Sequence, residues 1–156
     1  MGRRTGAVLV SLLLLLMLAV SASAAAVKMT VGVRFWRESG DKESMADSAV
    51  DTTREATLTR QPNGTFTLEL PVKQLSSMNM TGRLTGIAIG EVNYDGTLSG
   101  DLSDGTAVLT LKNLPASVLT GSDSSKALAV TCSIKMDTIL LGDISTSAKM
   151  SIWVER

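Results

Sequence analysis

Histidine is absent from the 156 residues of this chain, and cysteine and tyrosine occur once each. Without histidine, histidine-based catalytic triads, histidine-rich zinc sites and histidine-ligated haem are all excluded. The acidic residues are scattered singly rather than in the alternating pattern of a calcium loop, and no nucleophile motif of the G-x-S-x-G type lies in a suitable context. These absences predict that the protein is not an enzyme.

The single cysteine, Cys132, cannot form an internal disulfide, so core packing alone must hold the domain together. Cys132 lies within an apolar alternation, which favours a buried, inert thiol over a reactive one.

An excess of charge of either sign is also missing. The chain has 15 Lys and Arg residues against 15 Asp and Glu residues, for a formal net charge of +0. Two of the basic residues, Arg3 and Arg4, lie in a segment that we expect to be removed, which leaves 15 − 2 = 13 basic and 15 acidic residues, a balance near −2. This balance gives no reason to expect nucleic acid or an anionic membrane as a partner.

The N-terminus has the pattern of a secretory signal peptide. Arg3 and Arg4 precede an apolar run, Ala7 to Val20, that is short for a membrane span, and Ala22-Ser23-Ala24 fits the A-x-A preference of signal peptidase. We therefore expect residues 1–26 to be cleaved, with no membrane span afterwards. The mature protein is predicted to be secreted, either extracellular or associated with the cell wall; an uncleaved signal anchor is the alternative.

Residues 27–156 have the length of one domain, and their apolar residues alternate with polar ones. The alternation starts at Val27, recurs on both sides of an Asn63-Gly64 turn, which is typical of a hairpin, and returns from Leu128 to Met136. It predicts an all-β protein: an immunoglobulin-like antiparallel β-sandwich of seven or eight strands, or a small barrel, with one short helical turn at residues 43–47. The predicted core consists of Met29, Val31, Val33, Phe35, Leu58, Phe66, Leu68, Val130, Cys132, Ile134, Ile152 and Val154.

The segment from Ser39 to Asp47, directly after the first predicted strand, resembles the lip helix of NEAT domains, the near-iron-transporter modules of bacterial surface haem-uptake systems. In that family a β-sandwich holds haem between the lip helix and the hairpin of the last two strands, and a lip serine helps bind a propionate. The resemblance implies haem as the cofactor, Ser44 and Met45 as lip residues of its site, and other surface haem-uptake proteins as candidate partners.

The chain departs from the family at the iron ligand. Haem-binding NEAT domains carry a Y-x-x-x-Y motif on the last strand, and the corresponding positions here fall near Ile144 and Ala148, neither of which can bind a metal. The single tyrosine, Tyr94, lies instead in a turn predicted at Asn93-Tyr94-Asp95-Gly96. Three alternatives follow: haem bound through another ligand, another flat apolar ligand, or no small ligand at all.

Methionine is the remaining soft ligand, because its thioether can coordinate haem iron. We single out Met45 on the lip and Met136 at the end of the penultimate strand, while noting that packing alone explains a methionine within an apolar alternation, such as Met136. The other candidates are Met78, Met80 and Met150. Ile139, Leu140, Leu141 and Ile144 are predicted to line an apolar groove that suits a flat ligand.

Two tryptophans, Trp36 and Trp153, are predicted to lie on the sheet face opposite Phe35. If both were exposed and adjacent, they would indicate a protein-recognition surface; coverage of both faces in a sandwich is the alternative. The sequence thus leaves two functions open. The first is a haem-binding or haem-relay module of an iron-acquisition system with non-tyrosine ligation, and the second is a non-haem surface-recognition or adhesion module on the same sandwich.

Overall fold

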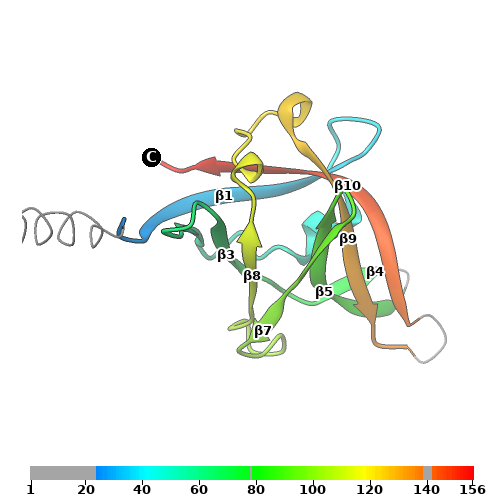
Figure 1. Ribbon diagram of the computed structural model, residues 1–156. Helices are drawn as coiled ribbons and strands as arrows, with labels where there is room; N and C mark the ends of the chain where they lie inside the picture. Colours follow the sequence, from blue (N-terminus) through cyan, green and yellow to red (C-terminus); the bar gives the residue numbers. More distant parts are fainter. Residues whose placement is uncertain (1–23, 78, 139–141) are drawn as a thin grey trace, which may run out of the picture.

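The computed structural model describes residues 24–77, 79–138 and 142–156. Most of the predicted signal peptide therefore lies outside the described residues, as do Met78 and the predicted groove residues Ile139, Leu140 and Leu141. The described chain forms ten strands and three short 3-10 turns (Figure 1). The strands are β1 (Val27–Arg37), β2 (Ala56–Arg60), β3 (Phe66–Pro71), β4 (Leu75–Ser77), β5 (Met80–Ile89), β6 (Val92–Asp95), β7 (Thr97–Ser99), β8 (Val108–Leu114), β9 (Leu128–Met136) and β10 (Asp143–Val154). The 3-10 turns are η1 (Met45–Ala49), η2 (Ala116–Val118) and η3 (Ser124–Lys126).

All strand pairs are antiparallel, in the order β4-β5-β9-β10-β1-β2-β3-β8-β7, with β6 added on β5. β1 belongs to both halves of this sheet, because it pairs with β2 over residues 27–31 and with β10 over residues 31–37. Figure 1 shows β1 running beside the C-terminal part of β10, while the first part of β10 runs beside β9. Within the described ranges, no helix has the length and apolar character needed to cross a membrane.

The prediction of an all-β antiparallel fold is confirmed, but the structure has ten strands rather than seven or eight. The difference comes from β4 and β6, which are only three and four residues long. An alternating pattern needs more residues than that to stand out.

The core prediction is confirmed for ten of the twelve residues, all of which are buried. Met29 is partly buried against the core, whereas Val154 is 49% exposed and its assignment was wrong. Val154 is the last residue of β10. The alternation therefore continues to a position that the opposite half of the sheet does not cover.

Cys132 is fully buried on β9. The loss of solvent raises the pKa of its thiol to about 12, so the thiol stays protonated at neutral pH. The prediction of a buried, inert cysteine is consistent with both findings.

The predicted Asn63-Gly64 hairpin is confirmed, and it joins β2 to β3. Gly64 has a φ of 85°, in the left-handed region that favours glycine, and its N–H donates to the Gln61 carbonyl over 3.0 Å. The Asp95-Gly96 pair, predicted as another turn, instead links β6 on one half of the sheet to β7 on the other. A Cβ at Gly96 would lie 2.3 Å from Leu109 Cδ1, so only glycine allows this close crossing.

Candidate functional site

The predicted helical turn after β1 is present as η1. Ser44 is its N-cap: its hydroxyl oxygen accepts a hydrogen bond from the N–H of Ala46 over 3.1 Å. The Ser44 N–H donates to the Phe35 carbonyl over 2.9 Å. The N-cap of η1 is thereby attached near the C-terminal end of β1.

A second attachment comes from Asp47, which the sequence analysis counted only among the scattered acidic residues. Its Oδ1 accepts a hydrogen bond from the N–H of Phe35 over 2.7 Å. Partial burial of Asp47 raises the pKa of its carboxyl group, and the hydrogen bond from Phe35 opposes that rise. The only sequence signal for this role is the position of an acidic residue in the first turn of a helix.

Ser44 and Met45 line the same open hollow of about 520 Å³ beside η1. Ser44 is buried, whereas Met45 is 37% exposed. Three basic residues, Arg34, Arg37 and Lys73, share the lining with Glu43 and Asp47. The hollow is therefore polar, and it suits an anionic group better than the flat apolar face of a ligand.

Met136 lies elsewhere, on the inward face of β9, and is buried. It is paired with Gly82 of β5, where a Cβ would lie 2.8 Å from the Met136 Sδ. Its N–H donates to the Gly142 carbonyl over 3.1 Å at the base of the β9–β10 connection. The hollow that holds Met45 includes no described residue of β9 or β10, so it does not bring the two candidate thioethers together.

Ile144 and Ala148, at the positions where the family carries tyrosines, lie on the inward face of β10. They are paired with Ile134 and Val130 of β9. Ala148 is buried, and Ile144 is partly buried against the core. Both therefore share an apolar wall with Met136. The remaining predicted wall residues, Ile139 and Leu140, are outside the described part of the chain.

Other metal-binding groups are scarce in the described residues. No cluster of three or more His, Cys, Asp or Glu residues that could hold a metal ion is found there. Tyr94 lies on β6, paired with Ile87, and is partly buried against the core. Cys132 is protonated and buried, Met150 is fully buried, and Met80 is partly buried against the core, so Met45 is the most exposed soft ligand among the candidates that the structure describes.

The two tryptophans lie on the face of β1 and β10 opposite Phe35, as predicted, and both are half-buried. The Trp36 indole N–H donates to the Ser151 hydroxyl over 2.9 Å, and the Arg34 guanidinium carbon lies 5.4 Å from the Trp36 ring centroid. Trp153 is paired with Gly32, and the Arg34–Ser151 pair separates the two rings along the sheet. They therefore do not form the exposed, adjacent pair that an adhesion surface would require.

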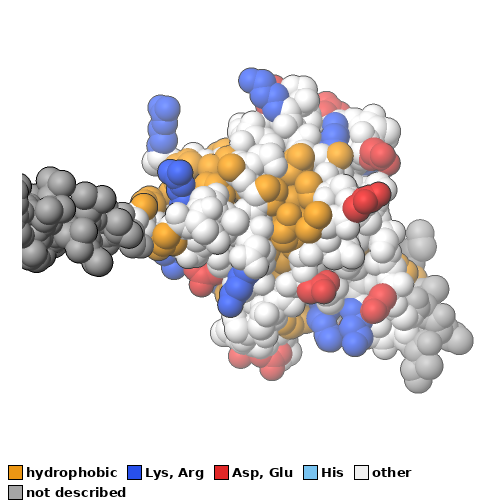
Figure 2. All heavy atoms as spheres, in the orientation of Figure 1, with side chains coloured by type: hydrophobic (Ala, Val, Ile, Leu, Met, Phe, Trp, Pro, Cys, Tyr) orange, Lys and Arg blue, Asp and Glu red, His pale blue; other side chains and the backbone are white. Residues whose placement is uncertain are grey.

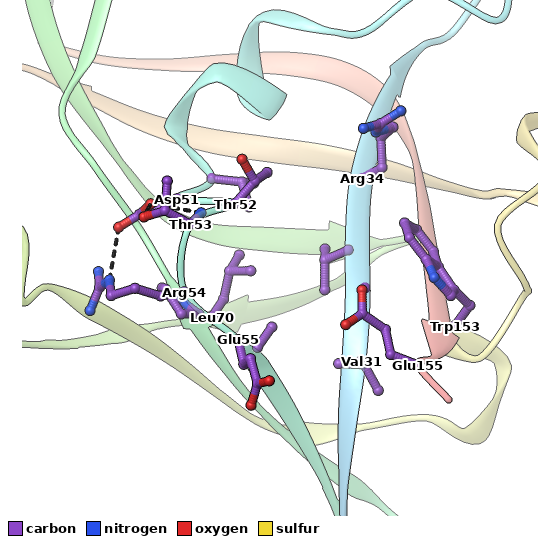
Figure 3. Close-up of a pocket in the computed structure, with 15 residues that line it drawn as sticks. Val31, Arg34, Asp51, Thr52, Thr53, Arg54, Glu55, Leu70, Trp153 and Glu155 are labelled. Carbon is purple, nitrogen blue, oxygen red and sulfur yellow. Dashed lines mark hydrogen bonds and ion pairs between the residues drawn. The ribbon is translucent and has the colours of Figure 1, made fainter.

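A second hollow, of about 240 Å³, lies between β1 and the 51–55 turn, and the sequence analysis did not anticipate it (Figure 3). On the turn side, the Asp51 carboxylate and the Arg54 guanidinium form an ion pair of 2.8 Å. Hydrogen bonds from the Thr53 hydroxyl and from Arg54 lower the pKa of Asp51 to about 2. The other side is formed by β1 and by Trp153 and Glu155 at the end of the chain.

Comparison with known proteins finds similarity only at the level of structure. No protein-family model matches the sequence, and no curated protein matches it. The structure is similar to the NEAT5 domain of IsdX2, a B. anthracis hemophore in complex with heme, with a TM-score of 0.53 and 12% identity over 85% of this chain and 99% of that chain. A point mutant of the same domain, also in complex with heme, gives the same TM-score and identity over 85% of this chain and 98% of that chain. The resemblance seen in the lip segment thus extends to the whole domain, and the chain has a NEAT-like fold.

Proposed function

We propose that this chain is a haem-binding module of an iron-acquisition system in which tyrosine does not ligate the iron. The observation that carries the proposal is the likeness of the fold to nearly the full length of a NEAT domain in complex with haem. The lip supports it, because η1 follows β1 and is capped by a serine, as the family pattern requires.

Met45 is the proposed iron ligand. Its thioether is the exposed one of the two candidates, while Met136 is buried against Gly82. We propose that Met136, Ile144 and Ala148 form the apolar wall of the groove, together with Ile139 and Leu140 as the sequence predicts. When bound, haem supplies an iron centre that accepts a thioether ligand.

Ser44 is the proposed propionate contact. Its oxygen already accepts the Ala46 N–H, so its own hydroxyl hydrogen remains available to donate to a carboxylate. Arg37 and Lys73 on the same hollow form no ion pair among the described residues, and they add positive charge that favours an anionic group.

Titration of the purified mature protein with haem tests this proposal. We expect saturable binding at micromolar haem and a low-spin, thioether-type Soret spectrum. Met45→Leu keeps the apolar side chain but removes the sulfur, so it should abolish the low-spin spectrum. Met136→Leu should leave it unchanged, because the buried thioether acts only in packing.

Three outcomes would change this view. A spectrum unaltered in Met45→Leu would exclude Met45 as the iron ligand but would still support haem binding by the domain. Loss of the low-spin spectrum in Met136→Leu alone would transfer the role to Met136. The absence of saturable binding would discard haem and make surface recognition, the second function considered above, the better account.

We further propose that the protein is exported and cleaved after Ala24 or Ala26. β1 begins at Val27, so either cut leaves its first strand whole. Intact-mass measurement of secreted material should give a chain that begins at Ala25 or Val27. A membrane-bound form that begins at Met1 would contradict the proposal.

A further inference from the structure

The sheet has a local gap beside β1. The β1–β2 pairing ends at Val31, and the lip takes over that edge at Phe35, whose N–H and carbonyl bond to Asp47 and Ser44. Between Val31 and Phe35, the backbone of Val33 has no neighbouring strand on this edge of β1 in the described part of the chain.

The direction of the Val33 backbone follows from its neighbours. Thr30 accepts a hydrogen bond from the N–H of Glu155 on the β10 side, while the two backbone groups of Phe35 bond on the opposite side. Successive residues of a strand direct their N–H and C=O groups to alternate edges. Val33 therefore points its N–H and C=O into the gap, and neither group has a hydrogen-bond partner among the residues described.

The gap exists because the chain after η1 turns toward β3. Val50 forms a bridge with Val72, the Asp51 N–H donates to the Pro71 carbonyl over 3.0 Å, and the Lys73 N–H donates to the Ala49 carbonyl over 2.9 Å. These bonds hold residues 49–51 against residues 71–73 instead of β1. The space left behind is the hollow of about 240 Å³, with Val33 in its lining (Figure 3).

The charged side chains around this hollow have a net negative charge, because both arginines are paired and two glutamates have no ion pair among the described residues. Arg34 pairs with Glu43 over 3.6 Å, and Arg54 pairs with Asp51. Glu55 and Glu155 are exposed and have no ion pair in the described part of the chain. Figure 3 shows them coming from opposite sides, Glu55 from the turn and Glu155 from the end of β10.

Trp153 adds an aromatic surface. It lines the hollow, is half-buried, and lies so close over Gly32 that a Cβ there would be 2.2 Å from its ring carbons. An aromatic face beside free carboxylates attracts a cationic side chain.

We propose that this hollow is a docking site for an extended basic peptide of a partner protein. The peptide backbone adds a short strand at the free edge of β1, exchanging hydrogen bonds with Val33 N–H and C=O. A lysine or arginine side chain of the peptide lies near Glu55, Glu155 and Trp153. The site uses neither Met45 nor the apolar wall of β9 and β10, and it shares only Arg34, Val50 and Thr52 with the lining of the lip hollow, so it does not need bound haem.

The test uses a fluorescein-labelled peptide, acetyl-Thr-Lys-Val-Lys-Thr-amide, and the mature protein without haem. We expect saturable binding, with slower hydrogen exchange at the Val33 amide measured by NMR. Glu55→Gln and Glu155→Gln should each weaken binding by about threefold, the size expected for an exposed ion pair. Glu91→Gln is the matched control, because Glu91 is exposed in the turn between β5 and β6 and does not line the hollow; it should leave binding unchanged.

Two matched peptides separate the backbone and charge contributions. Methylation of the peptide nitrogens removes their hydrogen-bond donors, and replacement of both lysines by glutamate reverses the charge; each change should abolish binding. No saturable binding of the lysine peptide at millimolar concentration would overturn the proposal. Equal binding of the glutamate peptide, or binding without protection of the Val33 amide, would overturn it as well.

Discussion

Replacement of Ile134 by alanine is expected to lower the free energy of unfolding by about 2–5 kcal/mol, the usual cost of truncating a buried isoleucine. Ile134 is fully buried in the C-terminal half of β9, paired with Leu84 of β5 on one side and Ile144 of β10 on the other. The loss of its side chain would leave a cavity among three strands. Urea denaturation, followed by circular dichroism, measures the change.

Val154→Ala is the control, because Val154 shares the alternating pattern but is 49% exposed at the end of β10. Its effect should stay within about 0.5 kcal/mol. If Ile134→Ala fails to fold, Ile134→Val should still fold and cost about 0.5–1.5 kcal/mol. Neutral behaviour of both Ile134 variants would show that β9 faces the other way.

Arg54→Met should lower the free energy of unfolding by about 1–3 kcal/mol, since the hydrogen bonds it removes involve a charged donor. The guanidinium Nε bonds to Asp51 Oδ2 over 2.8 Å, and Nη2 bonds to the carbonyl of the buried Ala107 over 2.6 Å. Arg54 thereby ties the 51–55 turn to the start of β8. Arg60→Met, at an exposed arginine with no ion pair within the described ranges, should change little.

The same substitution should change the response to acid. The pKa of Asp51 is about 2 in the folded protein and is lowered from 3.8, so the carboxylate contributes stability above about pH 4 that is lost as the pH falls toward 2. Without Arg54, the folded pKa moves back toward 3.8 and this loss becomes smaller. An unchanged slope of stability between about pH 4 and pH 2 in Arg54→Met would show that the Thr53 hydroxyl alone holds the pKa down.

Figure 2 shows why the surface alone does not identify a site. Acidic and basic side chains are spread around the visible face, and apolar side chains gather in its middle. This mixture agrees with the balanced composition of 15 basic and 15 acidic residues. No single charged patch dominates this face. The candidate sites, at the lip and at the Val33 gap, are therefore defined by local geometry.

The sequence by itself determined the features that depend on neighbours along the chain. Alternation predicted β9 at its observed bounds, Leu128–Met136, because a strand with one buried face repeats every two residues. The Asn63-Gly64 turn and the short helical turn after β1 were likewise evident, since turn and cap geometry depends on a few adjacent residues. The lip segment carried enough of this local pattern to indicate the NEAT-like fold.

Only the tertiary structure decided the features that depend on which distant strands meet. Met45 and Met136 are equivalent thioethers in the sequence, yet one is exposed on η1 and the other is buried against β5. Val33 looks like its neighbours Val31 and Phe35, yet its backbone lacks a partner among the described residues, because the 49–51 segment pairs with the end of β3 instead. Local pattern specifies which face of a strand is apolar, but hydrogen-bond partners and exposure are set by long-range pairing that no short stretch of sequence encodes.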